Sequence, residues 1–269
     1  MTHQGIEPLT FISLLHLHTL ENVIIYMKRK LVQIIGGSAS TAYALDKGQL
    51  PWPDLISKRF PELEFKHNSQ KGLTFIQAIN LLSDMPESEI VIFHFGTSIG
   101  WPIRLGNLSK RIGFGPKNEF SFQQPPKKYT GSTYQRLLKL VQLKIRNTLK
   151  YFFFIFGKYR PRTSIMEVSD QIDVVLKITK LKFKKTIWIQ HKSLPLTRTL
   201  VERRSYDKFY TQIIKILNNK LSDNFILIQL PEDFLKLNNY LLDGVHLTAQ
   251  GHKELAELIE EKFSLLLFD

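Results

Sequence analysis

Short apolar runs recur along the chain, and turn-forming or polar residues separate them. Five runs have the length of a buried strand, and they cover residues 31–35, 63–67, 90–95, 186–190 and 225–230. Runs of this length are typical of parallel strands that are buried on both faces. Apolar residues at three- and four-residue steps predict helices over 73–82, 165–180, 201–221 and 248–267.

The alternation of these elements predicts the fold class. Strands that alternate with helices favour a parallel sheet covered by helices on both faces. We therefore expect an α/β protein, with three α/β/α layers around a five-stranded parallel sheet. Ligands of such sheets bind beyond the carboxyl ends of the strands, so residues that directly follow a strand are the first candidates for chemistry.

The positive charge is concentrated in one segment. The chain has a formal net charge of +13, and residues 101–165 hold 14 of its 37 Lys and Arg but one acidic residue, Glu119. A nucleic-acid enzyme usually spreads basic residues over a face drawn from several elements, so we expect no nucleic-acid partner. We instead predict a single domain over 27–269 with a basic insertion at about 101–164.

Residues 134–156 of this insertion have the pattern of a basic amphipathic helix. Apolar residues recur at helical spacing, and lysine and arginine lie off that stripe. The apolar stripe can pack on the domain while the charges face water. Alternatively, the basic face holds the protein against an anionic membrane surface, so that residues 134–156 would form a peripheral membrane contact.

The chain start and the cysteine count bear on localisation. No run of about 18 uncharged apolar residues predicts a membrane span. Residues 1–26 lack a signal-peptide pattern and are predicted to be an N-terminal extension, with Met27 as an alternative start. The absence of cysteine excludes disulfides and a cysteine nucleophile, and it fits a reducing compartment. We expect a cytoplasmic protein, or one at the inner face of the membrane.

Ser38 directly follows the first predicted strand, within Gly36-Gly37-Ser38-Ala39-Ser40. The two glycines permit a sharp turn, and the helix expected after it would aim its amides at the Ser38 hydroxyl. A turn of this kind can expose a nucleophile. The same pattern also forms phosphate-binding loops or plain connections, so by itself it leaves the function open.

Asp243 and His246 lie shortly before the last predicted helix. A carboxylate three residues before a histidine can hold the ring by one nitrogen while the other nitrogen faces a serine. The chain order Ser, Asp, His occurs in hydrolases of α/β architecture, although a helix cap followed by a surface histidine would give the same pattern. We predict a catalytic triad of Ser38, Asp243 and His246.

The remaining histidines have simpler interpretations. His94 lies within a strand pattern and is expected to be a packed core residue. His67, His191 and His252 show no spacing that indicates a metal site. We therefore expect neither a metal nor an organic cofactor.

The sequence from Asp243 to Thr248, with Gly251 and His252, resembles the last signature block of the SGNH/GDSL hydrolases. Residues 36–40, 68–74 and 95–99 resemble the three earlier blocks, in the family's order. The resemblance implies a flavodoxin-like fold and an esterase or acyl-transfer activity. It also implies an oxyanion hole built from Ser38, Gly72 and Ser98.

Two positions depart from the family's pattern. Gly37 stands where the family usually has aspartate, and Ser98 stands where it has an asparagine donor. A branch associated with polysaccharide biosynthesis also lacks that asparagine, and residues 96–104 are loosely similar to it.

Together these features imply a serine esterase that removes a small acyl group, acetyl in particular, from a carbohydrate or related ester. One alternative is a glycan O-acyltransferase that uses the same site. Another is a non-catalytic protein that binds glycans or membrane surfaces and has lost the oxyanion hole.

Overall fold

The computed structural model describes residues 30–43, 45–70, 72–95, 103–104, 148, 152, 160–161, 164–196, 200–236, 238–241 and 245–267. The predicted extension at 1–26 and most of the basic insertion lie outside these residues. Ser98 and Asp243 lie outside them too.

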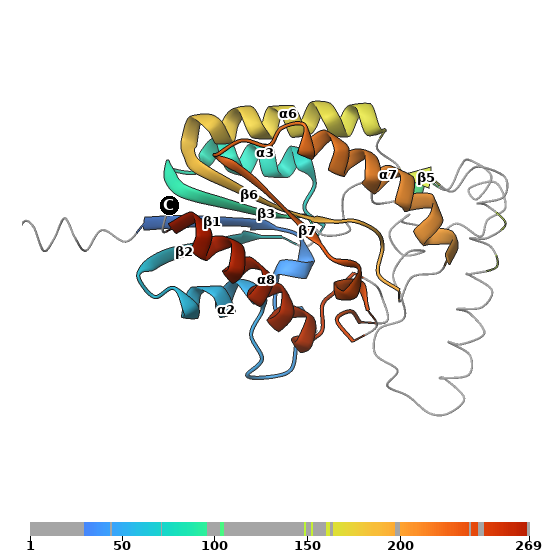
Figure 1. The fold of residues 1–269 in the computed structure, drawn as a ribbon, viewed down its shortest axis with the longest axis horizontal. Helices are drawn as coiled ribbons and strands as arrows, with labels where there is room; N and C mark the ends of the chain where they lie inside the picture. The colour runs from blue at the N-terminus through green and yellow to red at the C-terminus, as the bar shows by residue number, and fades with distance from the viewer. Residues whose placement is uncertain are drawn as a thin grey trace, which may run out of the picture.

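Five parallel strands form the central sheet, in the order β2-β1-β3-β6-β7 (Figure 1). The strands are β1 (Lys30–Gly36), β2 (Leu63–Ser69), β3 (Ser88–His94), β6 (Phe183–His191) and β7 (Phe225–Leu230). The helices are α2 (Trp52–Arg59), α3 (Phe75–Asp84), α6 (Ile165–Lys182), α7 (Leu200–Asn218) and α8 (Ala249–Leu267). Two single turns, η1 (Ser38–Ser40) and η3 (Glu232–Leu235), follow β1 and β7.

Helices cover both faces of the sheet, which confirms the predicted three-layer fold. In Figure 1, α3, α6 and α7 lie above the sheet, and α2 and α8 lie below it. Successive strand residues belong in turn to the hydrophobic cores on the two faces of the sheet, because side chains on a strand point to opposite faces. Ile35 belongs to the core under α3, α6 and α7, whereas its neighbour Ile34 belongs to the core under α2 and α8.

The strand order places a switch point beside β1. The chain runs from β1 outward to β2, and then returns across β1 to β3 and continues in the other direction. Ligands of open α/β sheets bind at such a point, beyond the carboxyl ends of the strands. Ser38 comes two residues after β1 and therefore lies at this position.

The helix expected directly after Ser38 is reduced to the single turn η1, and the next helix, α2, begins at Trp52. The Ser38 carbonyl accepts hydrogen bonds from both the amide and the hydroxyl of Thr41, at 3.2 and 2.8 Å. These bonds close the turn, and Thr41 itself is extended. The prediction of a helix here was wrong because Thr41 replaces the intrahelical hydrogen bonds with local ones.

The two ends of the basic segment meet in a short antiparallel ladder. β4 (Ile103–Arg104) pairs with β5 (Arg160–Pro161). Between them the structure describes Thr148 and Phe152, both in helical conformation, so the predicted membrane contact through 134–156 stays a prediction. Among the described residues, no helix is long and apolar enough to cross a membrane.

Gly251, in the first turn of α8, packs directly against the backbone of Asn239. A Cβ at this position would collide with the Asn239 carbonyl group. We expect Gly251→Ala to lower the free energy of unfolding by about 1–3 kcal/mol, because overpacking outweighs the helix propensity that alanine adds. Urea unfolding measures this loss.

Lys253→Ala is the matched control, since Lys253 lies in the same helical turn and is exposed. It should change the unfolding free energy by less than about 0.5 kcal/mol. An equal effect of both substitutions would contradict the close approach of α8 to Asn239.

Candidate active site

The turn that carries Ser38 is hydrogen-bonded to the end of the neighbouring strand β3. The Gly37 amide donates to the carbonyl of His94 at 3.0 Å, and the Ser40 amide donates to the Gly37 carbonyl at 2.9 Å. The side chain of Ser40 pairs with Nδ1 of His94 at 3.0 Å. Ser38 itself is half-buried at the surface of this turn. The turn therefore presents the Ser38 side chain at the carboxyl edge of the sheet.

Gly72 lies at the same edge, in the turn that follows β2. Its φ of +70° is in the left-handed region, where residues with a side chain are strained. β1 and β2 end side by side, and the Gln70 amide donates to the Gly36 carbonyl at 2.9 Å. The predicted nucleophile turn and the predicted oxyanion glycine thus belong to adjacent strand ends.

His246 lies in a loop that folds back on itself before α8. Tyr240 and Leu247 form an antiparallel bridge, and the Leu241 amide donates to the His246 carbonyl at 2.9 Å. The Thr248 amide donates to the Asn239 carbonyl at 3.0 Å. These bonds fix the backbone on both sides of His246, whose side chain is mostly buried.

Tyr43 connects the nucleophile turn to this histidine loop. Its ring lies against the imidazole of His246, with centroids 3.9 Å apart and planes inclined by 30°. Tyr43 comes five residues after Ser38 and is 39% exposed, so it also borders the solvent. This contact therefore places His246 beside the segment that carries Ser38.

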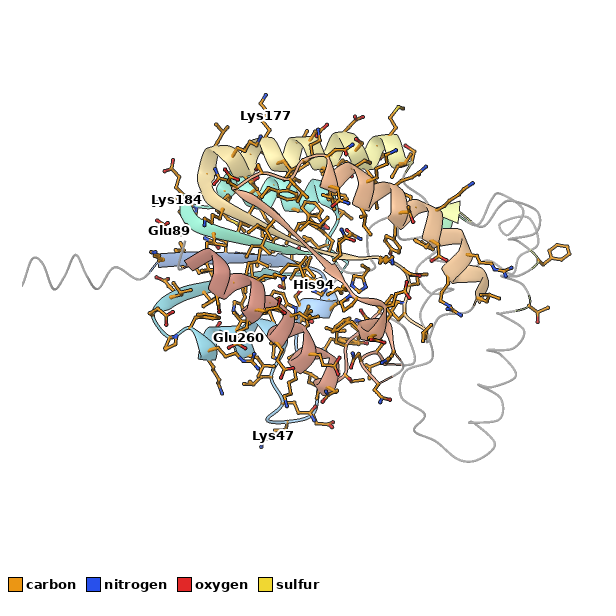
Figure 2. All side chains as sticks on the ribbon, in the orientation of Figure 1. Lys47, Glu89, His94, Lys177, Lys184 and Glu260 are labelled. Carbon is orange, nitrogen blue, oxygen red and sulfur yellow. The ribbon has the colours of Figure 1, made fainter. Side chains whose placement is uncertain are left out.

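Several histidines are buried beneath the two loops. Figure 2 labels His94, which lies inside the protein at the end of β3, and the structure confirms it as a core residue. Its ring stacks on that of His191, with centroids 5.7 Å apart, and His191 Nδ1 pairs with the Tyr240 hydroxyl at 3.2 Å. Burial lowers the pKa of His191 to about 4. It also lowers the pKa of His94 well below its ordinary value, with His191 and His252 contributing.

His252 holds α8 against the start of α2. The Trp52 amide donates to His252 Nδ1 at 3.1 Å. Burial, together with a smaller contribution from the nearby His246, lowers the pKa of His252 to about 4. A histidine with this pKa is uncharged at neutral pH, so it does not oppose a positive charge on His246.

The predicted site residues differ in how far the structure describes them. Ser38 and Gly72 follow the ends of β1 and β2, His246 lies in the loop before α8, and the ring of Tyr43 packs on His246. Asp243 and Ser98 lie outside the described residues, so their roles stay predictions. The contacts of Tyr43, Ser40 and His252 could not be predicted, because each joins residues that are distant in sequence.

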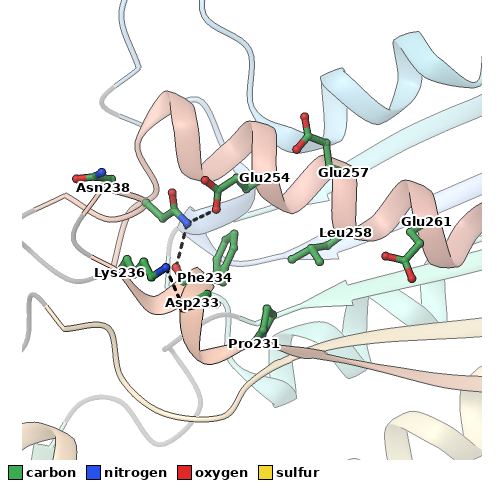
Figure 3. A pocket seen from close by; sticks show the side chains of 10 residues that line it. Pro231, Asp233, Phe234, Lys236, Asn238, Glu254, Glu257, Leu258 and Glu261 are labelled. Carbon is green, nitrogen blue, oxygen red and sulfur yellow. Dashed lines mark hydrogen bonds and ion pairs between the residues drawn. The ribbon is translucent and has the colours of Figure 1, made fainter.

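Figure 3 shows a pocket of about 360 Å³ that lies beside the first turns of α8. Its described lining comes from η3, the turn after it and α8, and includes Asp233, Glu254, Glu257 and Glu261. Ser38 and His246 are not among these lining residues. We therefore do not assign this acidic pocket to the ester group that Ser38 would attack.

Solved structures of several esterases share this architecture. The psychrotrophic esterase EstA from Pseudoalteromonas sp. has a TM-score of 0.52 and 12% sequence identity, over 89% of this chain and all of its own. The acetylxylan esterase Axe2 from Geobacillus stearothermophilus has a TM-score of 0.50 and 12% identity, over 87% of this chain and 94% of its own. The chain has the fold of these esterases.

A lipolytic protein of the G-D-S-L family from Veillonella parvula gives a similar result. Its TM-score is 0.51 at 10% identity, over 87% of this chain and 98% of its own. No family model matches the chain, and no curated protein matches it in sequence. At these sequence identities the likeness is one of fold alone, and the function depends on the residues of the site.

Proposed function

We propose that the chain is a serine esterase of the SGNH/GDSL kind. The observation that carries the proposal is the contact between Tyr43 and His246, which joins the Ser38 turn to the histidine loop at the switch point of the sheet. This is the edge where open α/β sheets bind their ligands. The esterases that share the fold support the same activity.

In the proposed mechanism, His246 takes the proton of the Ser38 hydroxyl while its oxygen attacks the ester carbonyl. The amides of Ser38 and Gly72 hold the negative oxygen of the tetrahedral intermediate, with Ser98 as the third predicted donor. His246 then protonates the leaving alcohol, and water releases the acyl group by the same steps. Asp243 would orient the ring and stabilise its protonated form.

For the substrate, we propose a small acyl group, acetyl in particular, on a carbohydrate or related ester. Two observations support this choice. One of the proteins that share the fold is named as an acetylxylan esterase. The sequence also resembles a branch of the family associated with polysaccharide biosynthesis.

A fluorophosphonate probe tests the activated serine without a known substrate. The attacking Ser38 oxygen would form a bond to phosphorus and displace fluoride, and mass spectrometry of the digested protein locates the adduct. We expect wild-type protein to be labelled at Ser38 and the Ser38→Ala variant to remain unlabelled. A folded wild-type protein that does not react would overturn the proposal and favour the non-catalytic binding protein.

A further inference from the structure

The mechanism above makes no use of the side-chain contact between Ser40 and His94. The two side chains come from different strand ends, and both are almost fully buried. Ser40 Oγ lies 3.0 Å from Nδ1 of His94, which is hydrogen-bonding distance. The His94 carbonyl also accepts from the Gly37 amide, so one residue of β3 holds the nucleophile turn at both ends.

Gly36 makes this contact possible. A Cβ at Gly36 would collide with the side chain of Ser40 and would lie 3.2 Å from the His94 carbonyl oxygen. The glycine therefore leaves the space into which Ser40 folds back beneath the turn. Within residues 36–40, Ser38 is partly exposed, whereas Ser40 is buried and hydrogen-bonded to His94.

His94 is suited to this role because it stays uncharged. Burial lowers its pKa well below the ordinary value, and His191 and His252 add to that shift. A neutral imidazole has one protonated and one bare nitrogen, so Nδ1 can pair with a hydroxyl in either tautomer. Its ring is held on one side by the parallel ring of His191 and on another by the edge of Trp52.

We propose that His94, through its hydrogen bond to Ser40, is a positioning residue for the Ser38 nucleophile. The proposal rests on the esterase function proposed above. The hydrogen bond fixes the inner end of the turn, and thereby the direction in which the Ser38 hydroxyl leaves it. A displacement of about 1 Å in a reacting group can lower a rate by about 10²-fold.

The test compares the rate at which the fluorophosphonate probe labels Ser38 in variants of the full chain. Ser40→Ala removes the hydroxyl alone, and His94→Leu removes the ring nitrogens. We expect each to slow labelling by about 10- to 100-fold. The double variant should be no slower than either single one, because both substitutions remove the same interaction.

His94→Asn supplies the rescue, since an asparagine amide can place a polar atom near the position of Nδ1. We expect it to label within a few-fold of wild type. Thr179→Val is the matched control, because Thr179 is a buried residue of α6 whose hydroxyl donates to the Leu176 carbonyl at 3.0 Å. It should lose stability without slowing the reaction.

Circular dichroism and urea unfolding establish that each variant is folded before its rate is compared. If folded Ser40→Ala reacts as fast as wild type, or if His94→Asn is as slow as His94→Leu, the positioning role is wrong. These outcomes differ from a failure of the proposed esterase function, in which the wild-type protein would not be labelled at all.

Discussion

His246→Ala should lower kcat/KM for a simple acetyl ester such as p-nitrophenyl acetate by about 10³- to 10⁴-fold. Without the imidazole, no base takes the Ser38 proton during attack on the ester carbonyl. The fold should survive, because the backbone around His246 is held by the bridge between Tyr240 and Leu247. Steady-state kinetics on purified protein measure the change.

Two further measurements show whether the loss reflects the missing base. Imidazole added to the buffer should restore part of the rate in His246→Ala, since the small base can enter the space beside Tyr43. His67→Ala is the matched control, because His67 is a residue of β2 whose Nδ1 lies 3.3 Å from the Asp54 carboxylate of α2. Unchanged kinetics in His246→Ala would remove this histidine from the mechanism.

Acid should destabilise the protein between about pH 6.5 and pH 4, above the range in which most carboxylates titrate. His191 and His252 have folded pKa values of about 4, below the ordinary value of 6.5. The unfolded chain therefore binds more protons in this window, so stability is fully present above pH 6.5 and is lost as the pH falls. Each histidine contributes a loss of about 2 kcal/mol by pH 5, and His94 acts in the same direction.

Urea unfolding at pH 7, 6 and 5 measures this effect. The His191→Gln variant cannot take up the proton, so its stability should fall about 2 kcal/mol less than that of wild type between pH 7 and pH 5. The quantity compared is the change in unfolding free energy between pH 7 and pH 5, so a loss of stability that is the same at every pH does not affect the result. A wild-type stability that is flat over this range would contradict burial of the neutral histidines.

The sheet was predictable because its strands are short apolar runs bounded by turn residues. Ile34 and Ile92 lie in such runs, and both are buried in the sheet. The start of β6 was missed, since Lys184 and Lys185 interrupt its apolar pattern and no turn residue separates it from α6. The strand order β2-β1-β3-β6-β7 was not predicted, because it depends on which strands pair once the chain folds.

The candidate site was predictable only in part. Ser38 and His246 stand out because each lies in a local motif that directly follows or precedes a regular element. The packing of Tyr43 on His246 has no local signal, and neither does the bond between Trp52 and His252. Such contacts depend on how distant elements dock, so they appear only once the fold is known.

β3 is the strand that connects β1 and β2 to β6 and β7, and its Ile92 pairs with Ile187 of β6. The entire basic segment lies between these two strands in the sequence. During synthesis, β1, β2 and β3 therefore leave the ribosome long before the partner of β3 exists. Until then the apolar β3 presents an unpaired edge, which is the kind of surface that recruits strands from other chains. Yield in a cell should accordingly depend on chaperones that shield the nascent half-sheet.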